Sequence, residues 1–106
     1  MKILDLQLQA TLDNFYDEFI EIVPTDEILF DLKIEGILSD REMDEIRNHV
    51  HKKDGTKQLF DILRRRCRQN DLQKFCRKLQ KNQVRTIQKF GEKLSRAISN
   101  RGSREG

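Results

Sequence analysis

Apolar residues in the N-terminal segment recur at intervals of three and four positions. This spacing places them on one face of an α-helix, because a helix completes a turn about every 3.6 residues. The pattern predicts an amphipathic helix over residues 4–22. Val23 and Pro24 end it, since proline lacks a backbone N–H donor and disfavours helix at the residue before it. The apolar positions are Leu4, Leu8, Leu12, Phe15, Phe19 and Ile22.

Start and stop signals predict two further helices in the next segment. Thr25 is the expected N-cap of the second helix, which ends near Glu35. Gly36 follows and can adopt the left-handed conformation that closes a helix. Ser39 and Glu42 have the spacing of a capping box at the start of the third helix. The apolar positions expected to be buried are Ile28, Leu29, Leu32, Met43, Ile46 and Val50.

Three more amphipathic segments follow a polar break at residues 51–55. The fourth helix precedes three consecutive arginines, and Asn70 and Asn82 are the expected N-caps of the fifth and sixth. Gly91 weakens the sixth helix by about 1 kcal/mol relative to alanine. We expect the domain to span residues 1–98 and residues 99–106 to form a flexible basic tail or linker. The expected core positions are Leu59, Phe60, Ile62, Leu63, Leu72, Phe75, Cys76, Leu79, Val84 and Ile87, with either Phe90 or Leu94 and either Ala97 or Ile98.

The predicted fold class is all-α, because no segment alternates with a period of two. The chain of 106 residues suits one domain, and it is 37% charged and 36% hydrophobic. No apolar run approaches the ~20 residues that a membrane span needs. Asp5 lies where a signal peptide would be apolar, and there are only two cysteines. We therefore expect a cytoplasmic protein with reduced thiols.

Charge is divided unevenly along the chain. Residues 1–50 hold four cations and thirteen anions, a net charge of −9, and residues 51–106 hold seventeen cations and five anions, a net charge of +12. The formal total is only +3. Such a division points to charged partners rather than to catalytic chemistry.

Two motifs resemble those of caspase recruitment domains. Residues 34–42, Ile-Glu-Gly-Ile-Leu-Ser-Asp-Arg-Glu, resemble the junction of that family's helices 2 and 3. Residues 54–63, Asp-Gly-Thr-Lys-Gln-Leu-Phe-Asp-Ile-Leu, resemble its helix 4, and Phe75 and Leu79 match its helix 5. The resemblance covers about residues 4–98. The chain departs from the family at residues 66–70, which lack the usual Gly-Pro turn, and in its long, basic last helix.

This resemblance implies a six-helix antiparallel bundle of the death-fold (Greek-key) type, with no catalytic activity and no cofactor. Such domains bind copies of themselves and other caspase recruitment domains, and they often form filaments in apoptotic or inflammatory signalling. An acidic face docks on a basic face, and a head-to-tail contact of this kind generates an open helical assembly. By resemblance the acidic face comprises Asp31, Glu35, Asp40, Glu42 and Glu45.

The expected basic face begins at Lys53 and Lys57, which match cationic positions of the family. Arg64, Arg65, Arg66 and Arg68 join it on composition, since arginine pairs well with carboxylates. For any one of these residues a solvated surface charge is the simpler reading, because exposed ion pairs contribute only about 0–1 kcal/mol. The segregated pattern as a whole favours an interface.

Nucleic-acid binding through the basic half is the strongest alternative function. Against it, Phe60, Phe75 and Phe90 fall on predicted core faces rather than on stacking platforms, and the acidic half would repel phosphate. Contact of the last helix with anionic lipid is less economical, because its apolar residues suit a bundle core.

Enzymatic and metal-binding functions have little support in the sequence. His49, His51, Cys67 and Cys76 lack the spacing of a zinc site. Cys76 falls on a core face and is expected to be an inert thiol. Neighbouring arginines would favour the thiolate of Cys67 if it were exposed, but a tolerated surface or half-buried cysteine is the simpler reading. No Gly-rich phosphate loop or paired-carboxylate motif stands out.

Overall fold

The structure is a computed structural model that describes residues 6–66 and 68–103, and residues 100–103 by their backbone alone. These ranges form seven helices and no strand, which confirms the all-α class. In chain order the helices are α1 (Leu6–Asp13), α2 (Tyr16–Ile22), α3 (Thr25–Ile34), α4 (Asp40–Arg47), α5 (Lys52–Arg66), α6 (Gln69–Gln80) and α7 (Arg85–Ser103).

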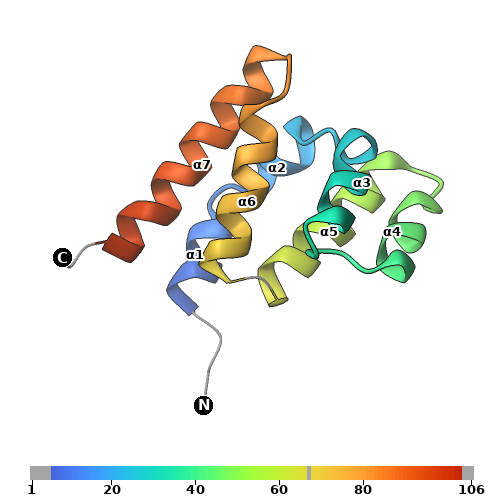
Figure 1. The fold of residues 1–106 in the computed structure, drawn as a ribbon, viewed down its shortest axis with the longest axis horizontal. Coiled ribbons are helices and arrows are strands. Elements are labelled where there is room, and N and C mark those ends of the chain that lie inside the picture. The colour runs from blue at the N-terminus through green and yellow to red at the C-terminus, as the bar shows by residue number, and fades with distance from the viewer. Residues whose placement is uncertain (1–5, 67, 104–106) are drawn as a thin grey trace.

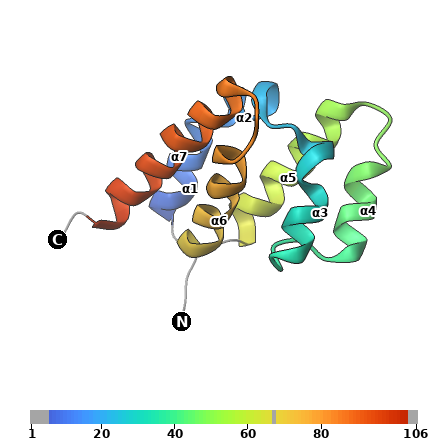
Figure 2. The ribbon, with the colours of Figure 1, turned by 45° about the horizontal axis from the view of Figure 1, so that its top comes forward.

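The helices gather around α5. In Figures 1 and 2, α6 and α7 lie side by side as an antiparallel hairpin, and α3 and α4 lie toward the opposite end of the molecule. Helix α5 packs against α1, α2, α3 and α4, and the hairpin is covered by α1 and α2 on its α7 side and by α3 on its α6 side. The fold therefore leaves one long side of the α6–α7 hairpin uncovered by the other described helices.

The predicted first helix is divided into α1 and α2 at Asn14 and Phe15. The amide of Phe15 donates to the carbonyl of Leu12 at 2.9 Å, a tighter turn than that of an α-helix. The division allows α1 to pack on α7 while α2 packs on α5. Because the apolar spacing stays helical through this turn, periodicity alone does not reveal it.

Several predicted helix ends are confirmed and others are wrong. Gly36 has a positive φ of 82°, and Ser39 and Glu42 form the complete capping box at the start of α4. Thr25 is not an N-cap but the first residue of α3. Its hydroxyl is buried and lies 2.7 Å from the hydroxyl of Thr56 on α5. The hydroxyl therefore joins two helices instead of capping one.

The predicted polar break at residues 51–55 is largely helical, because α5 begins at Lys52. Gly55 is buried there against α4, and a Cβ atom at this position would lie 2.9 Å from the carbonyl oxygen of Ile46. Glycine in this segment therefore permits a close helix crossing rather than ending a helix. Val50, expected in the core, is 91% exposed in the connection before α5.

The last two helices also begin at other residues than expected. Arg68, not Asn70, occupies the N-cap position of α6. The side-chain oxygen of Asn82 accepts from the amide of Val84 at 2.8 Å, and α7 begins only at Arg85. Val84 consequently lies outside the helix and is 51% exposed, not buried. Helix α7 continues to Ser103, past the boundary expected at residue 98, and residues 104–106 lie outside the described part.

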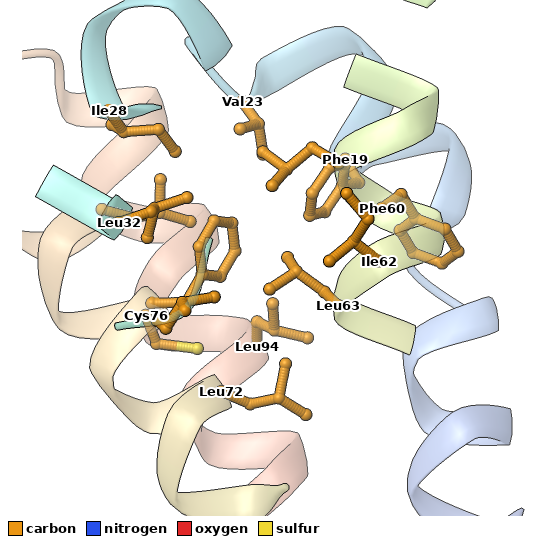
Figure 3. Packing of buried hydrophobic residues seen from close by; sticks show 14 of the residues in the cluster. Phe19, Val23, Ile28, Leu32, Phe60, Ile62, Leu63, Leu72, Cys76 and Leu94 are labelled. Atoms are coloured by element: carbon orange, nitrogen blue, oxygen red, sulfur yellow. The ribbon is translucent and has the colours of Figure 1, made fainter. Parts of the chain in front are cut away.

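Phe19 of α2 is the centre of the core. Its side chain is fully buried, and its ring centroid lies 5.0 Å from that of Phe60 on α5, 5.6 Å from that of Phe75 on α6 and 6.4 Å from that of Phe90 on α7. Figure 3 shows Phe19 and Phe60 together beside the leucines that fill the space between α5, α6 and α7. One aromatic side chain therefore joins four helices, and the three phenylalanines of the basic half are core residues, as expected.

The α6–α7 hairpin is joined by a row of glutamine amides. The Nε2 atoms of Gln69, Gln73 and Gln80 on α6 donate to the carbonyl oxygens of Ile98, Ser95 and Gly91 on α7, at 3.2, 3.3 and 3.5 Å. The hydroxyl of Ser95 in turn lies 2.7 Å from Oε1 of Gln73. These residues mark the side of each helix that faces the other.

Candidate interaction surfaces

Four of the five acidic residues expected to form a face have partners within the molecule. Glu35 lies 3.4 Å from Lys78, and Asp40 lies 3.0 Å from Lys33. Glu42 accepts from the backbone of Ser39 and pairs with Arg66, and Glu45 accepts from the amide of Gln58 at 3.0 Å. In the described part of the chain only Asp31 of this set has no such partner.

Most of the expected basic residues on α5 also form ion pairs within the molecule. The guanidinium of Arg64 donates two hydrogen bonds to the carboxylate of Asp13 on α1, at 2.7 and 2.9 Å. This hydrogen bonding lowers the pKa of Asp13 below its ordinary value and raises that of Arg64. Lys53 lies 2.6 Å from Glu21 on α2, and Arg65 pairs within α5. Arg64 and Lys53 therefore join α5 to α1 and α2.

Two of the expected basic residues have no ion pair within the described part of the chain. Lys57 and Arg68 are exposed, and neither forms an ion pair with another described residue. Since a charge without an internal partner can pair with another molecule at lower cost, Asp31, Lys57 and Arg68 are the members of the predicted faces best placed for an interface.

Helix α3 presents an apolar pair that the sequence interpretation missed. Phe30 is 60% exposed and Ile34 is 64% exposed, one helical turn apart. Both lie on the side of α3 opposite to its buried residues, and Asp31 lies between them in the sequence. We name Phe30, Asp31 and Ile34 the α3 surface. The sequence carries a signal for this surface, because α3 has more apolar residues than one helical face can hold.

A second group of cations lies on the uncovered side of the hairpin. In α6 the core positions include Leu72 and Leu79, and the row of glutamines faces α7. The remaining side of α6 is basic. The side of α7 opposite its buried residues carries three cations with the exposed carboxylate of Glu92 among them, since both helices turn about 100° per residue. We name these residues the basic α6–α7 surface: Lys74, Arg77, Lys81, Arg85, Lys89 and Arg96.

None of these six cations forms an ion pair with a described residue. The two lysines beside them are neutralised at the margins of the surface, where Lys78 pairs with Glu35, the C-cap residue of α3, and Lys93 with Glu18 on α2. Carboxylates of the acidic half therefore pair with lysines of the hairpin at the margins of this surface. On the surface itself the six cations outnumber the carboxylate of Glu92, so its field is positive.

Residues 6–66 and 68–103 contain no group of three potential metal ligands. Cys76 is buried, and burial raises the pKa of its thiol to about 12. It is therefore protonated at neutral pH and inert, as expected. His49 hydrogen-bonds to Gln58, and Cys67 lies outside the described residues.

None of the described helices is long and apolar enough to cross a membrane.

The chain has no match among known proteins in three comparisons. No family model, no curated protein and no solved structure is significantly similar to it.

Proposed function

We propose that this domain is a protein-interaction module of the caspase recruitment type, a six-helix death fold with a divided first helix, that associates with copies of itself and with related domains. The observation that carries the proposal is the α3 surface. Two large apolar side chains are exposed beside a carboxylate that has no ion pair in the described part of the chain. Aromatic anchors of this kind, set among polar groups, are typical of interface hot spots.

The chain itself offers a surface of complementary chemistry. Val50 is exposed just before α5 begins, and Lys57 lies in the second turn of that helix with no ion pair to a described residue. Docking of Phe30 and Ile34 near Val50, with Asp31 against Lys57, would use different surfaces of two copies. Such a heterologous contact repeats from copy to copy and suits a filament or a recruiting platform in apoptotic or inflammatory signalling.

The apolar part of this contact can be tested by Phe30→Ser. We expect the variant to remain folded and to lose self-association, because truncating a central anchor typically costs more than about 2 kcal/mol of binding free energy. Light scattering at falling salt concentration measures the association. Val84→Ser is the matched control, because Val84 is also exposed but lies outside the proposed contact. Equal assembly of the Phe30 and Val84 variants would contradict the proposal.

The charged part can be tested by reversal and restoration. We expect Asp31→Lys or Lys57→Glu alone to abolish self-association, since each places like charges opposite one another. The double variant restores the pair with its polarity exchanged and should recover assembly in part. Neither residue has an ion pair in the described chain, so the thermal transition should hardly change. Full assembly of both single variants would refute this pairing.

A further inference from the structure

The basic α6–α7 surface has more positive charge than the proposed self-association can use. The α3 surface offers one unpaired carboxylate, whereas six cations without an ion pair to a described residue lie on the outer side of the hairpin. Helix α6 and its C-cap residue Lys81 contribute three of them, and α7 contributes the other three. A partner that matches this surface must carry many regularly spaced negative charges.

The arrangement of the cations is that of two rows. Residues 74 and 77 of α6 and its C-cap residue 81 follow one face, and residues 85, 89 and 96 follow one face of α7 with Glu92 among them. The α7 row extends about 16 Å at a rise of about 1.5 Å per residue. The axes of packed helices lie about 8–10 Å apart, so the two rows run beside one another along the hairpin.

The chemistry of this surface favours phosphate over the other polyanions. The large apolar residues of α7, among them Ile87, Phe90 and Leu94, are buried in the core. The surface therefore has no apolar side to insert into a lipid bilayer, which an interfacial helix needs. The phenylalanines of α6 and α7 are buried too, so stacking on unpaired bases has no platform. What remains is contact with a phosphate backbone.

We propose that the basic α6–α7 surface binds the phosphate backbone of double-stranded nucleic acid without sequence preference, the two rows contacting the strands on either side of a groove. The two carboxylates of the acidic half at the margins of this surface, Glu18 and Glu35, are already paired with Lys93 and Lys78, and the six cations outnumber Glu92 on the surface itself. The site is distinct from the α3 surface, and the inference does not depend on self-association.

The test is fluorescence anisotropy of a labelled DNA duplex of about 20 base pairs, titrated with the Phe30→Ser variant to limit self-association. We expect the affinity to fall about a thousandfold between about 50 and 200 mM salt, since six phosphate contacts release about five counterions. An affinity that does not depend on salt would overturn the proposal.

Two triple variants of equal charge locate the site. Lys81→Gln/Arg85→Gln/Lys89→Gln removes half of the surface and should weaken binding at low salt more than about tenfold, lowering the salt slope by about three. Arg41→Gln/Arg47→Gln/Lys57→Gln removes three exposed cations elsewhere and should change the affinity less than about threefold. Circular dichroism verifies that both variants fold. Equal weakening by the two variants would overturn the proposal, because the attraction would then come from net charge alone.

The other polyanions are separate arms of the same experiment. Vesicles with anionic lipid and a polyglutamate chain are each used as competitors of the labelled duplex at equal charge concentration. We expect neither to displace the DNA as well as an unlabelled duplex does. Displacement by vesicles at equal efficiency would assign the surface to a membrane, and displacement by polyglutamate would assign it to an acidic protein. Either result would overturn the assignment to nucleic acid.

Discussion

Replacement of Phe19 by alanine is expected to lower the free energy of unfolding by about 3–5 kcal/mol. The side chain is fully buried and meets rings on α5, α6 and α7, so the substitution removes apolar contacts from four helices at once and leaves a cavity among them. Edge-on and stacked aromatic pairs add about 0.5–1.5 kcal/mol each beyond buried area. Urea unfolding followed by circular dichroism measures the loss.

The control for Phe19 is the same substitution on the surface. Phe30→Ala removes the same atoms from a side chain that is 60% exposed and should change stability by less than about 0.5 kcal/mol. Domains of this size have total stabilities of about 5–15 kcal/mol, so the Phe19 variant should show a much lower urea midpoint. Equal midpoints for the two variants would show that α2 does not occupy the centre of the core.

Gly91→Ala is expected to destabilise the protein by about 1–3 kcal/mol, although alanine is the better helix former by about 1 kcal/mol. An added Cβ atom would lie 2.8 Å from the Cβ of Leu79 and 3.0 Å from the carbonyl oxygen of Cys76. Both atoms are fixed to the backbone of α6, so the two helices must separate to relieve the clash. Thermal unfolding of the variant gives the sign of the effect.

The matched control for Gly91 is Thr86→Ala on the exposed side of the same helix. Thr86 contributes nothing to the core, so this substitution reports helix propensity alone and should leave stability unchanged or slightly higher. A Gly91 variant that gains stability like the Thr86 variant would mean that α6 and α7 are not in close contact at this position. The glycine would then be the weak point that the sequence alone suggests.

The helical class and most of the core could be predicted because both depend on apolar spacing. Phe19, Phe60 and Phe75 stand on apolar faces whose period is visible in the sequence. The division of the first helix could not be predicted, because the turn at Asn14 preserves that period while changing which helices the two parts contact. The start of α3 could not be predicted from Thr25, because the hydroxyl of this residue bonds to Thr56 on α5 instead of capping the helix.

The sign of each charged surface could be predicted, but not which of its residues lack an ion pair within the described part of the molecule. The uneven division of charge is a property of the sequence. The ion pairs are not, because Arg64 pairs with Asp13, 51 residues away in the sequence, and Lys53 pairs with Glu21, 32 residues away. Such pairs form only when the fold brings α5 to α1 and α2. The exposure of Phe30 was equally hidden, because α3 has apolar residues on both its inner and outer sides.

The glutamine row between α6 and α7 separates the cohesion of the hairpin from its charge. The glutamine amide hydrogen bonds that join the helices involve no ionisable group, and none of the ion pairs among described residues connects α6 to α7. Added salt therefore has no attractive ion pair to screen between these two helices. The two most basic helices can gain or lose counterions on their outer side while the position of α6 relative to α7 stays the same.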